Sequence, residues 1–161
     1  GSLGAQILDD VVPHAIVATK NKKIFVTHQT RPENVAKLQR FYADNKIHAN
    51  VLSFIHDMAG AITGADLVIG RSGASTVVEL QTIGRPAILV PLGINPDQAA
   101  NAECFAKSGG GFAIAQSKFT VKWLTSMLVE LFDNPSRLNK MASKALVKNN
   151  AVNLIADEIL K

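Results

Sequence analysis

The segment at residues 71–76, RSGAST, joins a short apolar run to a helical pattern, and a lone carboxylate, Glu79, follows inside that pattern. Small residues at a helix start allow an anion to approach free backbone N–H groups, where the positive end of the helix dipole also favours phosphate. Residues 1–5 and 92–98 have the same character and also lead into helical patterns. Together, the three segments predict a phosphate or diphosphate site.

Two charged residues of this region have more than one interpretation. Glu79 lies about one turn inside the helix, where a carboxylate accepts two hydrogen bonds from a ribose diol or interacts with the helix dipole or a neighbour. Arg71 either neutralises a diphosphate or pairs with an acidic neighbour. The spacing alone leaves both choices open.

Residues near the other strand ends have similar alternatives. Residues 95–98, NPDQ, fit the N-cap to N3 positions of a helix. Gln98 therefore closes a capping box or offers its amide to a sugar hydroxyl, and the local pattern favours the cap. Phe54 and Met58 follow an apolar run, where they either frame a base ring or belong to the core.

Several classes of protein are disfavoured. The P-loop and the dinucleotide pattern G-x-G-x-x-G are both absent, which argues against an ordinary ATPase and a nicotinamide-dependent dehydrogenase. The four histidines show no metal-ligand spacing with Cys104 or with carboxylates, so we expect no metal and no cofactor. A net charge of +4 with scattered lysines argues against nucleic-acid binding. A single cysteine and the lack of a long apolar run favour a cytoplasmic protein.

Apolar runs of strand length alternate with helical patterns along the chain. Strands are expected at 23–28, 49–54, 66–70, 87–92 and 111–115, and helices at 4–11, 33–45, 57–64, 75–83, 97–107, 120–132, 136–148 and 151–160. The strand runs are nearly continuous, as in strands covered on both faces. Thr120, Ser136 and Asn150 are the expected N-caps of the last three helices, and Gly84 is an expected stop. The order predicts an α/β fold, a Rossmann-like, doubly wound parallel sheet with a helical C-terminal tail.

The first ten residues read as the glycine turn and first helix of a β-α unit. The strand of that unit is expected just before Gly1, so we predict that residues 1–161 form one domain truncated at that point. Alternatively, Gly1 and Ser2 are the remnant of a tag and the turn is accidental.

Taken together, several motifs resemble the C-terminal, donor-binding half of the MurG family of GT-B glycosyltransferases. The matching segments, in chain order, are GSLGAQ, THQT, SFIHDM, ADLVIGRSGASTVVEL, GRPAILVPL and DQAANA. The resemblance implies transfer of N-acetylglucosamine from UDP-N-acetylglucosamine to lipid I, with inversion, to form lipid II in peptidoglycan synthesis. It also implies a bacterial enzyme at the cytoplasmic face of the inner membrane, with roles in cell division and shape.

The resemblance assigns roles to individual residues. Ser2 meets a phosphate, Phe54, Ile55 and Met58 frame the uracil, the N–H groups of Gly73, Ala74 and Ser75 bind the diphosphate, Glu79 holds the ribose, and Gln98 contacts the sugar. Arg71 matches the motif without an assigned contact. No metal is implied.

The resemblance also sets limits on what this chain does. The general base and the lipid I site are expected in an N-terminal domain that residues 1–161 lack, so the chain alone is expected to bind donor without turnover. Asp97 stands where the family carries His or Gln, and the loop before Gln98 is short, which leaves sugar selectivity less determined. The alternatives are a separate donor-binding subunit of a two-chain transferase and an epimerase-like UDP-sugar-binding protein.

Overall fold

The computed structural model describes residues 5–147 and shows an α/β fold of alternating helices and short strands. The helices are α1 (Gln6–Ala18), α2 (Pro32–Asp44), α3 (Met58–Gly64), α4 (Ala74–Ile83), α5 (Pro96–Lys107), the 3-10 turn η1 (Gln116–Lys118), α6 (Val121–Phe132) and α7 (Pro135–Ala145). The strands are β1 (Phe25–Gln29), β2 (His48–Leu52), β3 (Val68–Gly70), β4 (Ala87–Leu89) and β5 (Gly111–Ala113). All five predicted strands are present, which confirms the fold class.

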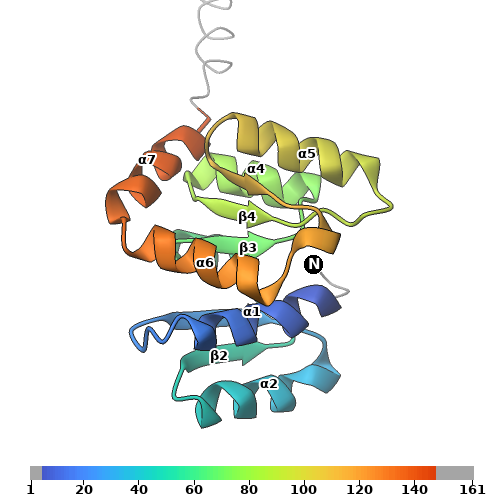
Figure 1. The fold of residues 1–161 in the computed structure, drawn as a ribbon. Coiled ribbons are helices and arrows are strands. Elements are labelled where there is room, and N and C mark those ends of the chain that lie inside the picture. The colour runs from blue at the N-terminus through green and yellow to red at the C-terminus, as the bar shows by residue number, and fades with distance from the viewer. Residues whose placement is uncertain (1–4, 148–161) are drawn as a thin grey trace, which may run out of the picture.

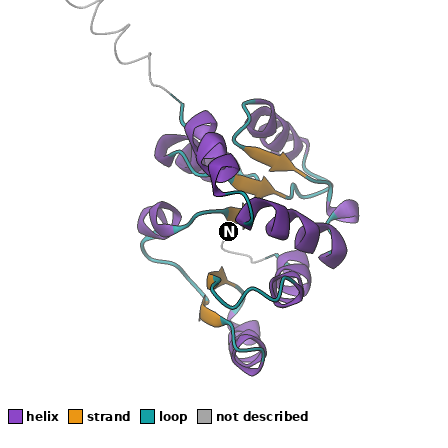
Figure 2. Cartoon of the chain, turned by 60° about the vertical axis from the view of Figure 1, so that its left-hand side comes forward, coloured by secondary structure: helices purple, strands orange, loops and turns teal. Residues whose placement is uncertain are grey.

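The strands pair in parallel and form two sheets. β1 pairs with β2, and β4 lies between β3 and β5. Figure 2 shows the two sheets as separate groups of strands. Because all the pairs are parallel, the carboxyl ends of the strands in each sheet share one edge, where an α/β fold binds its ligands.

The three-stranded sheet is covered on both faces, as a doubly wound fold requires. Ile88 and Val90 are buried in a core with residues of α1 and α6, whereas Ala87 and Leu89 are buried in a second core with residues of α4 and α5. Successive strand residues point to opposite faces, so these two cores lie on opposite sides of β4. The continuous apolar run at residues 87–90 reflects this double burial.

Helix α1 connects the two sheets. Its buried residues share a core with Val26 of β1 and Ile88 of β4, and α1 packs against α6. Figure 1 shows α1, in blue, between the strands of the two sheets. The prediction ended this helix at residue 11, but it continues to Ala18 because Ala15 and Ile16 extend its buried face beyond Pro13.

The ends of several helices confirm the local predictions, and one corrects them. Thr120 caps α6 through the N–H of Trp123, and Gly84 ends α4 with a φ of 74°. Helix α7 begins one residue earlier than expected, because Asn134 accepts from the N–H of Arg137 and is the N-cap instead of Ser136. The predicted helix at 151–160 and its cap, Asn150, lie outside the described residues.

Candidate functional site

The carboxyl ends of β3 and β4 lead directly into two neighbouring helices. Residues 71–73 connect β3 to α4, and residues 90–95 connect β4 to α5. These strands are adjacent in one sheet and the two helices pack together, so the two connections lie side by side. Of the first predicted segment, residues 1–4, which include Ser2, lie outside the described residues, and Ala5 is the N-cap residue of α1.

The N-terminus of α4 lacks a side-chain cap. Gly73 is the N-cap residue in an extended conformation, and no side chain accepts from the first turn. The N–H of Val77 is bonded to Gly73 O, which leaves the preceding N–H groups, those of Ala74, Ser75 and Thr76, without a helical acceptor. By contrast, Asp57 caps α3 and Asn95 caps α5. Of these three helices, α4 is the one whose first-turn N–H groups have no side-chain acceptor.

Gly73 leaves open space in front of these donors. Its φ of −60° and ψ of 151° suit any residue, and a Cβ built on it meets nothing within 4 Å. Neither backbone conformation nor packing within the described chain requires a glycine here. A ligand that approaches the backbone closely would require one.

Glu79 lies on the same side of α4 as Ser75, because residues four apart are neighbours on a helix. It is partly exposed and makes no hydrogen bond or ion pair with another described residue. The first turn of α4 contains no acidic residue, so Glu79 lies beyond the reach of the dipole effect. Within residues 5–147, Glu79 therefore neither interacts with the helix dipole nor pairs with a neighbouring side chain, the two alternatives to a ligand contact.

Arg71 binds neutral oxygens. Its Nη1 donates to the carbonyl oxygens of Val90 at 3.0 Å and Pro91 at 3.2 Å, and Nη2 donates to Gln116 Oε1 at 2.8 Å. Burial lowers the pKa of the Arg71 guanidinium. The alternative of an acidic partner is not found in the described chain. Arg71 instead holds the end of β3 against the segments that follow β4 and β5, and its charge is not cancelled by a carboxylate there.

Gln98 only partly follows the capping-box prediction. Asn95 Oδ1 accepts from the N–H of Gln98 at 3.1 Å, as expected. The side chain of Gln98 does not return to the N–H of Asn95, because that group is bonded to Leu92 O. Gln98 Oε1 accepts from the N–H of Leu92 at 2.9 Å instead. Nε2 therefore remains as a donor without an acceptor in the described residues.

The residues predicted to frame the base differ in their exposure. Phe54 is 56% exposed and stacks edge-on against His56, so the alternative that places it in the core is wrong. Ile55 is partly buried, and Met58 packs against the core formed with α4 and α5. Helix α3, which Met58 opens, packs against α4. The Phe54 ring is thus largely exposed, with His56 against it.

A model of the glycosyltransferase family 28 C-terminal domain matches residues 1–159. The chain belongs to this family. Curated relatives named UDP-N-acetylglucosamine--N-acetylmuramyl-(pentapeptide) pyrophosphoryl-undecaprenol N-acetylglucosamine transferase include those of Mesorhizobium japonicum, 41% identical, and Agrobacterium fabrum, 43% identical. Each match covers 98% of this chain, but only 44% and 43% of the respective relative. The chain thus spans less than half the length of these relatives.

Solved structures agree with the family assignment. The crystal structure of Acinetobacter baumannii MurG matches with a TM-score of 0.85 and 37% identity, over 99% of this chain and 47% of that one. The glycosyltransferase VinC, 17% identical with a TM-score of 0.66, shares the fold over 89% of this chain and 36% of its own. The resemblance to MurG indicated by the sequence motifs is confirmed.

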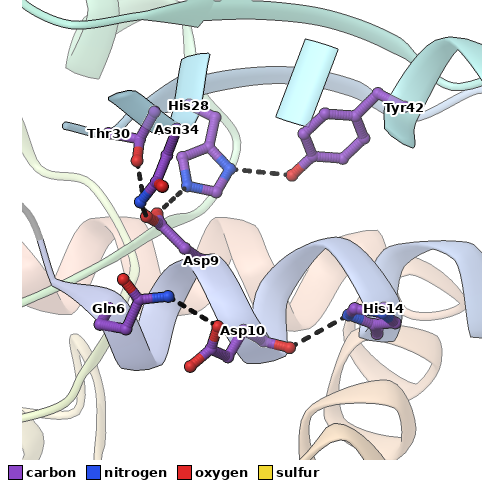
Figure 3. A network of polar contacts seen from close by, with 8 residues as sticks. All are labelled: Gln6, Asp9, Asp10, His14, His28, Thr30, Asn34 and Tyr42. Carbon is purple, nitrogen blue, oxygen red and sulfur yellow. Dashed lines mark hydrogen bonds and ion pairs between the residues drawn. The ribbon is translucent and has the colours of Figure 1, made fainter. Parts of the chain in front are cut away.

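This family 28 domain also contains a buried polar network that the sequence interpretation missed. Asp9 of α1 bonds through Oδ1 to His28 Nε2 at 2.9 Å, and its Oδ2 accepts from Thr30 Oγ1 at 2.5 Å and Asn34 Nδ2 at 2.9 Å. The other ring nitrogen of His28 lies 2.9 Å from the Tyr42 hydroxyl (Figure 3). The network therefore ties α1 to β1 and α2.

The environment of this network has a clear electrostatic consequence. Burial raises the pKa of Tyr42 far above its usual value, and the negative charge of Asp9 raises it further. Three donors compensate the buried Asp9 carboxylate, as a buried charge requires. The THQT motif is the sequence signal that could have revealed this site, and the structure places its His28 on the buried face of β1.

Residues 5–147 contain no group of three or more His, Cys, Asp and Glu side chains placed to hold a metal ion. Within the same range, no helix has the length and apolar character needed to cross a membrane.

Proposed function

We propose that this chain is the donor-binding half of a transferase that moves N-acetylglucosamine from UDP-N-acetylglucosamine to lipid I, forming lipid II. Relatives about 40% identical carry the name of this activity. The observation that carries the proposal is the uncapped start of α4 together with Glu79, a carboxylate on the same helix without a described partner.

In this proposal the N–H groups at the start of α4 bind the diphosphate of the donor. As the bond to the sugar breaks, negative charge grows on the leaving UDP, and fixed N–H donors stabilise that charge. Arg71 adds positive charge at the same edge while holding the strand ends together. The open space beside Gly73 lets the phosphates approach the backbone.

The remaining contacts give specificity for the nucleotide and the sugar. Glu79 accepts hydrogen bonds from the ribose hydroxyls, and the free Nε2 of Gln98 donates to the transferred sugar. Phe54, Ile55 and Met58 frame the uracil, and Ser2 meets a phosphate. These roles fit the exposed Phe54 ring and the partly exposed Glu79 and Gln98 side chains.

We further propose that a second domain completes the enzyme. The relatives are more than twice as long as the matched region, which is consistent with an acceptor domain that supplies the general base and the lipid I site. The isolated chain then binds donor without turning it over. In this proposal the complete bacterial enzyme acts peripherally at the cytoplasmic face of the inner membrane, and its product supports cell division and shape.

The split sheet suggests how the domain itself is completed. β1 and β3 are edge strands of two parallel sheets that α1 already bridges. We propose that a parallel strand preceding α1 pairs between them, since consecutive strands of a sheet usually lie side by side. Adding about ten upstream residues of a relative should then raise the thermal midpoint, and an unchanged midpoint would contradict this strand.

The direct test of the proposed function is calorimetric titration of the chain with UDP-N-acetylglucosamine and UDP, with ADP-glucose as the control. Binding of the uridine ligands alone is expected. A folded chain that binds none of them, or binds ADP-glucose equally well, would overturn the assignment of a uridine-nucleotide site to this domain.

A further inference from the structure

Ser72 is a fully buried polar residue directly before the start of α4. Its exposed fraction is 0%, and a hydroxyl in such a place needs a hydrogen-bond partner. Its Oγ donates to the backbone oxygen of Gln98 at 2.6 Å, and its own carbonyl oxygen accepts from Asn101 Nδ2 at 3.1 Å. Ser72 therefore binds the first two turns of α5 through both its side chain and its backbone.

These bonds join the start of α4, proposed to bind the diphosphate, to the start of α5, proposed to contact the sugar. On one side of Ser72 stands Gly73, the N-cap of α4, followed by the open N–H donors. On the other side of the contact is Gln98, whose side chain closes the turn at Leu92 and leaves Nε2 free. Ser72 thus links the N–H groups proposed to bind the phosphates to the Gln98 side chain proposed to bind the sugar.

The neighbouring bonds of Arg71 make this link rigid. Arg71 holds the same turn to the carbonyl groups of Val90 and Pro91 and to Gln116. The turn at residues 71–73 is consequently fixed from two sides, by the strand ends and by α5. A shift of α4 relative to α5 would break the buried Ser72 hydroxyl bond.

We infer that Ser72 is a positioning residue that couples the diphosphate and sugar subsites, so that the sugar adds affinity only while the starts of α4 and α5 are aligned. The inference rests on the proposed function, which supplies both subsites. The sugar and the diphosphate are covalently joined in the donor, so both are bound well only when the two helix starts have the correct spacing. Ser72 itself contacts neither group in this inference.

The test compares the Kd of UDP with that of UDP-N-acetylglucosamine for the full chain and for Ser72→Ala. Alanine fills most of the site and leaves the backbone bond from Asn101 in place, so the fold is expected to persist. The Kd of UDP divided by the Kd of UDP-N-acetylglucosamine should fall by about fivefold, because the sugar adds less affinity once the buried hydrogen bond that aligns the two helix starts is lost. The affinity for UDP alone should change much less.

The matched control is Ser143→Ala, which removes an exposed serine hydroxyl on α7 whose bond within the described residues is to the carbonyl oxygen of Asn139. Its ratio should equal that of the unmodified chain. If Ser72→Ala does not fold, Ser72→Cys is used, since the thiol has similar size but donates weakly. The cysteine variant should lower the ratio in the same direction.

The outcomes separate the two proposals. An unmodified chain that binds no uridine nucleotide contradicts the proposed function. If the chain binds both ligands but the ratio is unchanged in a folded Ser72 variant, or both affinities fall equally, the coupling role is wrong and the proposed function stands. An unmodified chain that binds both ligands equally would also overturn the coupling.

Discussion

Replacing Glu79 with alanine separates a ligand contact from a structural one. Glu79 has no described partner to lose, and alanine is the better helix former at this interior position of α4. The free energy of unfolding should therefore change by no more than about 0.5 kcal/mol. Losing hydrogen bonds between a carboxylate and the ribose should cost about 1–3 kcal/mol of binding, or roughly a five- to 150-fold weaker Kd for UDP.

Electrostatics sharpens this prediction. A negative charge close to a bound diphosphate repels it, so removing Glu79 would tighten UDP binding if the carboxylate made no contact with the ligand. The expected loss of affinity is thus opposite in sign to the charge effect alone. Glu79→Gln keeps one acceptor oxygen and should lie between alanine and the unmodified chain.

The assay is calorimetric titration with UDP, accompanied by thermal unfolding of each variant. Glu103→Ala is the matched control, because it also removes one glutamate from a helix. Among residues 5–147, Glu103 forms one exposed pair, with Lys107. That control should bind UDP as the unmodified chain does. Unchanged or tighter binding by a stably folded Glu79→Ala variant would refute the ribose contact.

Three further predictions concern other parts of the chain. Gly73→Ala should leave the thermal midpoint nearly unchanged, since a Cβ there meets nothing within 4 Å, yet weaken UDP binding; equal binding would show that the space is not used. Gln98→Glu keeps an acceptor for Leu92 but loses the Nε2 donor, so the Kd of UDP-N-acetylglucosamine should rise more than that of UDP, and equal effects would leave Gln98 a purely structural role. The raised pKa of Tyr42 stabilises the fold below about pH 10, the unfolded value, and this contribution is lost as the pH rises further. Alkaline titration of this single tyrosine by absorbance should show no tyrosinate near pH 10 while the chain stays folded, and a normal titration there would contradict its burial.

Local patterns predicted the elements around the site well. The small-residue turn before Ala74, the stop at Gly84 and the cap at Thr120 depend on a few adjacent residues, so their structures follow from nearby sequence. The boundaries were less accurate where packing decided them. Helix α1 extends past Pro13 because its later residues enter a core shared by two sheets, which no local signal reveals.

The partners of the polar side chains could not be predicted in the same way. Arg71 lies 19 residues from Val90 and 45 from Gln116, and the sequence offered an acidic partner or a diphosphate rather than these neutral oxygens. Asp9 and His28 are also 19 residues apart, and their network depends on the packing of α1 against β1. Contacts between residues so distant in the chain arise only when the elements that carry them pack together.

The sequence by itself determined the α/β order of elements, the open helix start at residues 73–76 and the family to which the chain belongs. These properties reside in local backbone preferences and in the spacing of short motifs. The tertiary structure alone decided that Glu79 has no described partner, that Ser72 joins α4 to α5, and that the strands divide into two sheets. Each of these depends on the relative positions of separate elements, because a hydrogen bond exists only within about 3 Å.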